Sequence, residues 1–214
     1  MSETPAWLKW LLLCGLTLGV AGYWGPWVHH RSVALLLTGP DLGEFVKFLP
    51  PVRAGQVLAF RQIFYLPPFA AAFTLAALAG SRLISRRLLP NALLLASVLP
   101  LSLALLPPVF TPSSLLSAEF RLQLLACVFC LLFAFGPGVL GLFSRRALLG
   151  TALAFCLGAA SLPLWQFLSL REPIQAAYGG PIALGWGLWA TPAGFLLAAS
   201  CTALALARPL FTKR

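Results

Sequence analysis

Charged residues are scarce in this sequence of 214 residues, since only 9% are Asp, Glu, Lys or Arg while 60% are hydrophobic. In soluble proteins about a quarter of the residues are charged, and a soluble fold of this length could not bury so much apolar surface. Long uncharged runs are instead typical of proteins that cross a lipid bilayer. The composition therefore excludes a soluble globular protein. It predicts a single integral membrane domain over residues 1–214, because no polar stretch is long enough to fold separately.

Acidic residues and histidines are also few, with five Asp or Glu and two His in the whole chain. No ionisable residue lies deep in an apolar run, which excludes a proton relay of intramembrane carboxylates. The sequence also lacks a glycine-rich phosphate-binding loop, a nucleophile elbow and a His-Glu-x-x-His motif. Any enzymatic chemistry would have to come from loops, and we expect no cofactor.

The cysteines and the basic residues exclude two further classes. All five cysteines fall in apolar runs, so no disulfide framework is indicated. Cys127 and Cys130 have the spacing of a redox pair, but no loop carries the second pair that membrane thiol oxidases need, and we interpret them as packing residues. The net charge is +10, yet the bases stand singly or in pairs between apolar runs. Such bases determine membrane topology, and we expect no binding of nucleic acid.

Six apolar runs are long enough to span a bilayer. The sequence therefore predicts an all-α fold, a polytopic membrane bundle of six transmembrane helices. A cleaved signal peptide, with Lys9 as its charged start, is the alternative interpretation of the first run. Gly15 and Gly19 in that run are spaced for close helix packing. The predicted spans are residues 7–28, 64–83, 91–110, 120–143, 148–170 and 181–207, with an outer loop at residues 29–63 and a polar link at residues 171–180.

Paired arginines set the predicted orientation. Arg86-Arg87 and Arg145-Arg146 follow the second and fourth runs. Lys and Arg gather in loops on the inner side of a membrane, so we expect both chain ends on that side. The excess of arginine over lysine favours a bacterial source. We expect the protein in the plasma (inner) membrane, with the lipid bilayer as a partner.

The sequence predicts a short amphipathic helix in the first outer loop. Thr38 and Asp41 have the spacing of a capping box, and Pro50-Pro51 ends the segment. The apolar residues Leu42, Phe45, Val46 and Leu49 fall on one helical face. A helix this short cannot span, so we expect it to lie in the membrane interface with its apolar face down. Residues 32–37 are interpreted as a second interfacial piece.

Aromatic residues with a polar atom gather on the predicted outer side. An interfacial belt is the simple explanation, but a belt would occupy both interfaces, and only Trp7 and Trp10 serve the inner one. The excess predicts an outward-opening aromatic cavity with arginines at its rim. The candidate ligand-binding residues are Arg31, Arg53, Arg61, Arg121, Arg171, Trp24, Trp27, Tyr65, Trp165, Tyr178, Trp186 and Trp189.

Metal binding is weakly indicated. His29 and His30 with Asp41 and Glu44 offer nitrogen and oxygen ligands. Adjacent histidines, however, do not present both rings on one helical face, and a third histidine is absent. We interpret them as a solvated pair and predict no metal site.

The plan of six short-looped helices with a sizeable first outer loop resembles the substrate-binding components of energy-coupling vitamin transporters, without a shared motif. The outer aromatic and arginine side predicts a transporter component that captures a small or amphipathic, anionic solute and needs an energising partner. Arg61 and Arg121 begin spans at the cavity rim and are the first residues to test. The alternatives are a structural or accessory subunit that binds lipid headgroups and a partner protein, or an outer-face thiol- or metal-dependent enzyme.

Overall fold

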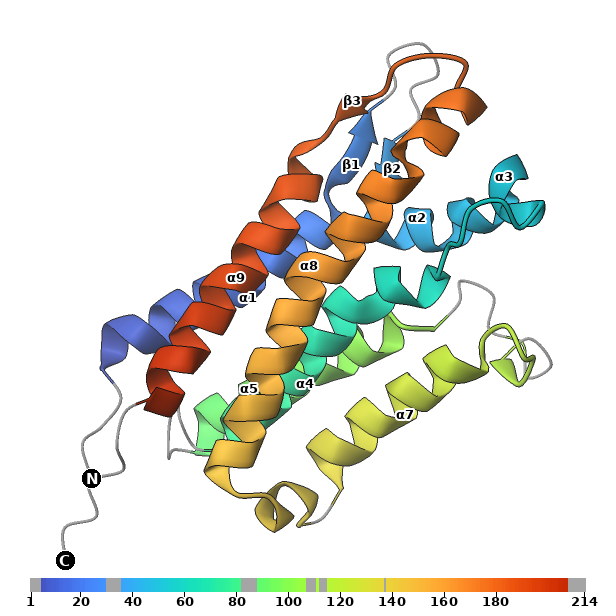
Figure 1. Cartoon of the computed structure of the whole chain (residues 1–214). Helices are drawn as coiled ribbons and strands as arrows, with labels where there is room; N and C mark the ends of the chain where they lie inside the picture. Colours follow the sequence, from blue (N-terminus) through green and yellow to red (C-terminus); the bar gives the residue numbers. More distant parts are fainter. Residues whose placement is uncertain are drawn as a thin grey trace, which may run out of the picture.

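The structure is a computed structural model that describes residues 5–29, 36–81, 88–106, 111, 115–136 and 138–207. It is mostly helical, and its longer helices form a bundle with a small sheet at one end (Figure 1). The features predicted at residues 30–35, 82–87, 107–110 and 208–214 lie outside the described residues. The long helices are α1 (Ala6–Trp24), α4 (Leu66–Gly80), α5 (Leu88–Leu103), α7 (Arg121–Phe135), α8 (Arg145–Ala177) and α9 (Trp186–Ala207).

Among the residues that the structure describes, four helical segments are long and apolar enough to cross a membrane: Ala6–Trp24, Arg61–Gly80, Arg145–Ala177 and Trp186–Ala207. Helices α5 and α7, with 16 and 15 residues, are shorter than the roughly 20 residues that a span requires. Six spans therefore stay a prediction. The fourth predicted span, residues 120–143, is wrong in extent, because α7 ends at Phe135. Gly138 has a left-handed φ of 77°, and a separate 3-10 turn, Val139–Leu142, follows.

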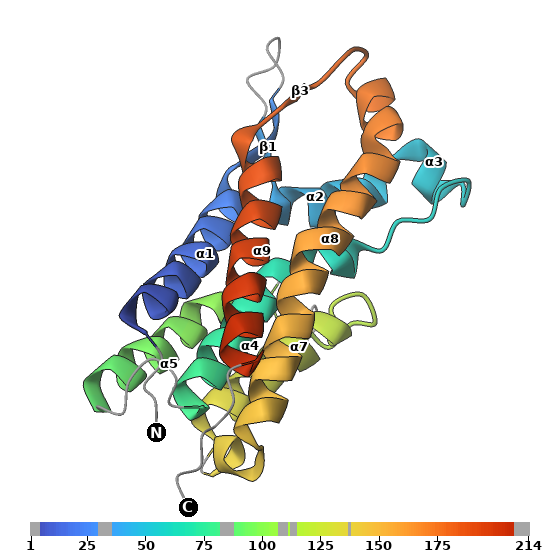
Figure 2. The ribbon, with the colours of Figure 1, turned by 60° about the vertical axis from the view of Figure 1, so that its left-hand side comes forward.

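Helices α1 and α9 lie side by side in opposite directions, in contact through glycines (Figures 1 and 2). A Cβ on Gly15 would lie 2.8 Å from the backbone nitrogen of Ala198, and one on Gly194 would overlap the backbone of Gly19. Backbones this close gain dispersion contacts that larger residues would prevent. The predicted packing role of Gly15 and Gly19 is confirmed.

Helix α8 corrects the predicted polar link at residues 171–180, because it continues to Ala177 through Pro173. At about 1.5 Å per residue, its 33 residues exceed the roughly 30 Å of bilayer hydrocarbon. Its last turns bury Leu170 and Ile174, one helical turn apart, against the short elements at that end of the molecule. Apolar contacts therefore extend the helix past the charges of Arg171 and Glu172.

A three-stranded antiparallel sheet, absent from the all-α prediction, joins distant parts of the chain. Strand β1 (Pro26–His29) lies between β2 (Leu36–Thr38) and β3 (Ala183–Leu184). Val28 pairs with Leu37 on one side and Leu184 on the other. The predicted ends of two spans are thus wrong: the first helix ends at Trp24, and the sixth begins at Trp186 rather than at residue 181. Residues 36 and 37, predicted as part of an interfacial piece, are β-strand.

Helix α2 (Gly39–Phe45) begins as predicted. The Asp41 carboxylate accepts hydrogen bonds from the backbone N–H of Thr38, at 2.9 Å, and from its hydroxyl, at 2.6 Å. A 3-10 turn η1 (Val46–Phe48) follows, and Pro50 then starts a short helix α3 (Pro50–Arg53). The prolines therefore end one helix and begin the next, because proline suits a first helical turn.

The apolar face of this segment packs on protein, which corrects the prediction that it lies on the membrane. Leu42, Val46 and Leu49 are buried. They belong to a second core, separate from that of the bundle, together with Trp27, Val28, Leu37, Phe64, Phe167, Leu170, Ile174, Ile182 and Leu188. We call the elements around this core, β1–β3, α2, η1 and the end of α8, the cap (Figure 2).

Substitution tests the glycine contact of α1 and α9. We expect Gly194→Ala to lower the free energy of unfolding by about 1–3 kcal/mol, because its Cβ meets backbone that must move. Gly150→Ala in α8 is the matched control. Nothing lies within 4 Å of its Cβ, so it should be neutral or stabilising. Unfolding followed by tryptophan fluorescence measures both, and equal stability of the two variants would contradict the contact.

Candidate functional site

Arg61 is the first residue of a 3-10 turn, η2 (Arg61–Tyr65), that leads into α4. It is only 8% exposed, which is unusual for arginine and requires charged or hydrogen-bonding partners. The turn brings Arg61 beneath the cap and places Phe64 in the cap core. The position of this charge therefore depends on both the cap and the bundle.

Two carboxylates and a lysine surround Arg61. Its guanidinium donates to Glu44 of α2 and to Glu119, which precedes α7. The ammonium of Lys47 donates to the same two carboxylates, at 2.9 Å to Glu44 and 2.8 Å to Glu119. These four residues form a closed ring of alternating charges, which we call the charge ring. It joins segments 58 and 72 positions apart in the sequence.

Aromatic rings cover the cations of the charge ring. The Arg61 guanidinium lies 4.7 Å from the centroid of Phe120, and the Lys47 ammonium 5.2 Å from that of Phe48. An open hollow of about 650 Å³, lined by Lys47, Phe48, Arg53, Arg61 and Glu119, lies beside the ring. The Nε of Arg61 is buried without a hydrogen-bond partner among the described residues. Arg53, at the end of α3, is exposed.

Contacts within the charge ring shift the pKa values of Glu44, Lys47 and Glu119, which lie outside the membrane-spanning segments. Burial raises the pKa of Glu44, but hydrogen bonds from Lys47 and Tyr65 and the nearby positive charges outweigh it, so the pKa is lowered. The hydrogen bond from Lys47 lowers the pKa of Glu119. Desolvation opposes the charge on Lys47, but its bonds to both carboxylates raise its pKa. All three groups are therefore charged at neutral pH.

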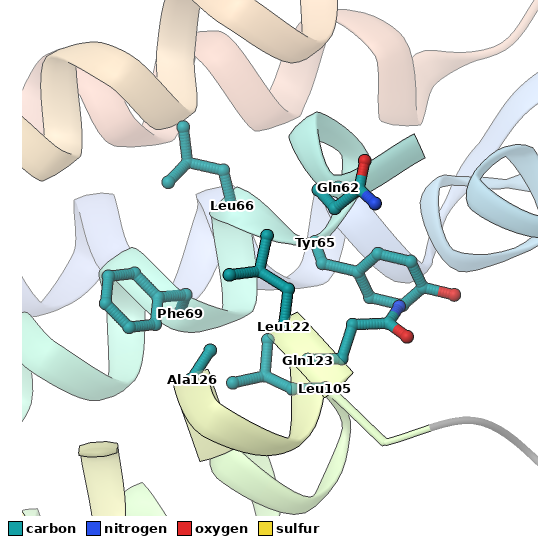
Figure 3. A pocket seen from close by; sticks show the side chains of 8 residues that line it. All are labelled: Gln62, Tyr65, Leu66, Phe69, Leu105, Leu122, Gln123 and Ala126. Carbon is teal, nitrogen blue, oxygen red and sulfur yellow. The ribbon is translucent and has the colours of Figure 1, made fainter. Parts of the chain in front are cut away.

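Tyr65 connects the charge ring to a second feature. Its hydroxyl donates to Glu44 at 2.7 Å, and its ring lines a pocket of about 160 Å³ where α4 and α7 begin and α5 has just ended (Figure 3). The surface exposed in the pocket is almost entirely apolar, and none of the described residues that line it is charged. We call this the apolar pocket; it is lined by Gln62, Tyr65, Leu66, Phe69, Leu105, Leu122, Gln123 and Ala126.

Gln123 is the unusual residue of the apolar pocket. It is only 3% exposed, and neither its amide nitrogen nor its amide oxygen has a hydrogen-bond partner among the described residues. The other buried glutamine, Gln166, donates to the carbonyl of Leu58 and accepts from the amide of Phe60. An unpartnered buried polar group costs about 1–3 kcal/mol. Gln123 is therefore a local cost to stability beside the pocket.

The structure brings only part of the sequence-predicted site together. Arg53 and Arg61 line the hollow, and Tyr65 lies between it and the apolar pocket. Trp27 and Tyr178 belong instead to the cap core or pack against it. The remaining described candidates are exposed and line neither space: Trp24, Trp165, Trp186, Trp189, Arg121 and Arg171. Arg31 lies outside the described residues.

The weak metal candidates are placed apart or already have partners. His29 is exposed at the end of β1, Asp41 caps α2, and Glu44 belongs to the charge ring. Within the ranges that the structure describes, no three His, Cys, Asp or Glu side chains are grouped as metal ligands would be. All five cysteines are free, and Cys127 and Cys130 are buried in α7.

Sequence reasoning missed the partners of Arg61. Lys47 and Glu119 read as ordinary loop charges, because nothing local indicates that they meet. Gln123 did carry a signal, as the one amide side chain in the predicted span 120–143. A buried polar residue in such a run requires a partner and marks a candidate functional site.

Comparison with known proteins identifies no relative: no family model, no curated protein and no solved structure matches the chain. Functional conclusions therefore rest on the geometry of the charge ring and the apolar pocket.

Removing the central cation tests the charge ring. We expect Arg61→Ala to lower the free energy of unfolding by about 2–4 kcal/mol, because it leaves two carboxylates short of a partner in a partly buried site. Arg53→Ala, at the exposed rim of the same hollow, should change it by less than about 0.5 kcal/mol. Denaturant titration of the purified variants measures both values. An Arg61→Ala variant as stable as Arg53→Ala would contradict a structural ring.

Acid should weaken the ring. The pKa values of Glu44 and Glu119 are lower in the folded protein than their ordinary value of 4.5. Their ionisation therefore stabilises the fold above about pH 4.5, and this stabilisation is lost as pH falls below that value. We expect the thermal midpoint of the wild type to fall between pH 6 and pH 3. The fall should be smaller in a Glu44→Gln, Glu119→Gln variant, and parallel curves would show that these carboxylates do not contribute.

Proposed function

We propose that the protein is a membrane-embedded binding component of a transport system, which takes up a small amphipathic molecule in the apolar pocket. The observation that carries this proposal is an apolar pocket at the end of the bundle that carries the cap, with the buried Gln123, which has no hydrogen-bond partner among the described residues, in its lining. Small-molecule sites are concave and mostly apolar, with a few polar groups that orient the ligand. The apolar pocket has this composition.

The location of the pocket supports entry from the outer face. It lies at the starts of α4 and α7 and close to the charge ring, at the end of the bundle that carries the cap. With both chain ends on the inner side, as the paired arginines predict, this end faces outward. Gln62, which is exposed, lies at the pocket and marks a route to solvent.

Energy for transport would come from a partner. The sequence contains no phosphate-binding glycine loop with which to hydrolyse a nucleotide. Helices α5 and α7 present exposed leucines and phenylalanines, among them Leu99, Leu125 and Phe129. Lipid or the helices of a partner subunit would cover these faces.

An accessory subunit is the second candidate, and the exposed face of α7 favours it. This helix has only 15 residues, so neighbouring helices of a larger complex would relieve its mismatch with the bilayer. The candidate predicts a stoichiometric complex in mild detergent that Leu132→Arg on the exposed face dissociates. Isolation as a single species without a partner would count against it.

Blocking the pocket tests the transport proposal. We expect untargeted mass spectrometry of an extract of the purified protein to detect a small retained compound, which Ala126→Phe removes because the new ring fills the pocket. Ala176→Phe on the exposed surface of α8 is the control and should retain the compound. Thermal unfolding confirms that both variants fold. A wild type without such a compound, or one whose compound persists in Ala126→Phe, would overturn the proposal.

A further inference from the structure

Helix α8 indicates the depth at which the membrane interface meets the cap. Its first residue is Arg145, and paired arginines of this kind gather at the inner interface. Gln166 follows roughly 20 residues later, which at about 1.5 Å per residue is about 30 Å, the thickness of the bilayer hydrocarbon. The neighbouring Trp165 is exposed, and tryptophan is enriched at membrane–water interfaces. Gln166 therefore marks the level at which the outer lipid headgroups begin.

The same glutamine holds the loop before Arg61 at this level. Its amide accepts from the backbone N–H of Phe60 at 3.3 Å and donates to the carbonyl of Leu58 at 3.4 Å. Leu58 and Phe60 are apolar, yet both side chains are exposed. Apolar side chains at the interface are buried among the upper parts of lipid chains. Arg61 follows this loop directly, so the charge ring lies at the level of the headgroups.

The hollow beside the charge ring is partly polar and partly apolar. Phe48 forms its apolar part and is 63% exposed, while charged side chains form the rest. Helix α3, which contributes Arg53, lies at the periphery of the cap end (Figures 1 and 2). The volume of about 650 Å³ falls within the roughly 300–1,000 Å³ of small-molecule sites. The hollow can therefore hold a headgroup with an apolar part beside it.

Two cations at the hollow have hydrogen bonds left to donate. The ammonium of Lys47 has three N–H groups, of which Glu44 and Glu119 accept two. The exposed Arg53 makes no hydrogen bond or ion pair among the described residues. With Arg61, three positive charges face two carboxylates, which leaves one positive charge in excess. The hollow therefore attracts an anion.

A phospholipid headgroup matches these features better than a free anion does. A phosphodiester carries one negative charge and two free oxygens, which accept from a guanidinium and an ammonium. Its chains would continue toward the hydrocarbon beside Phe48, Leu58 and Phe60. A free phosphate would meet the cations but leave these apolar side chains in water. The single excess charge favours a headgroup with a net negative charge over a zwitterionic one.

From these observations we infer that the hollow beside the charge ring binds the phosphate of an anionic phospholipid, held by the guanidinium of Arg53 and the remaining N–H of Lys47. The site is separate from the apolar pocket, and the inference does not depend on the proposed transport function. Arg53 is the residue that distinguishes anionic from zwitterionic headgroups. The bound lipid covers the exposed ring of Phe48.

Native mass spectrometry of the purified full chain tests this site. The protein is titrated with dioleoylphosphatidylglycerol, which is anionic, or with dioleoylphosphatidylcholine, which is zwitterionic. We expect the wild type to bind the anionic lipid about fivefold more tightly, because one basic residue near a membrane surface contributes about this factor. Arg53→Ala should remove the preference. Arg171→Ala, at another exposed arginine of the cap end, should leave it unchanged.

A soluble competitor separates the lipid from a free anion. Glycerol phosphate carries the phosphate without chains, and at a concentration equal to that of the lipid it should not displace it. Displacement would assign the hollow to a soluble phosphate and overturn the inference. No preference in the wild type, a preference that persists in Arg53→Ala, or one that Arg171→Ala also removes would each overturn it too. None of these results bears on the apolar pocket, which Ala126→Phe tests.

Discussion

The buried guanidinium of Arg61 is the constraint on which the arrangement of cap and bundle depends. An arginine that is 8% exposed must be neutralised, and its two carboxylates come from α2 and from the segment before α7. Lys47 closes the charge ring between the same carboxylates. The positions of three distant segments therefore follow from one charge, and the start of α7 is brought to the start of α4.

The same junction creates the apolar pocket. Tyr65 belongs to the turn that positions Arg61, and Gln123 follows Glu119 by one helical turn, so both pocket walls are attached to the charge ring. Both carboxylates of the ring accept hydrogen bonds from Arg61 and Lys47, whereas neither amide atom of Gln123 has a partner among the described residues. Proteins retain a residue that locally destabilises the fold mainly at functional sites. For this reason the pocket, rather than the ring, is the proposed site.

Local sequence patterns predicted the local features and missed the distant ones. The capping box of Thr38 and Asp41 and the glycine packing of α1 were readable, because each depends on residues within one or two turns. The sheet could not be predicted from the sequence. Its strands are two to four residues long, which is too short to show an alternating pattern of hydrophobicity, and β3 comes from the far end of the chain. Helix α8 was cut short because Pro173 and two charges normally end a helix, whereas contacts of Leu170 and Ile174 with the cap core extend it. The charge ring pairs residues far apart in sequence, which no spacing rule reveals.

A double-mutant cycle between Arg61 and Glu44 tests most directly whether this buried charge joins the cap to the bundle. The free energy of unfolding is measured for the wild type, Arg61→Met, Glu44→Gln and the double variant. Because the Arg61 side chain is 10% and the Glu44 side chain 27% exposed, we predict a coupling energy of about 1–3 kcal/mol. Additivity within about 0.5 kcal/mol would contradict the account, since it would mean that the two residues do not interact in the folded protein.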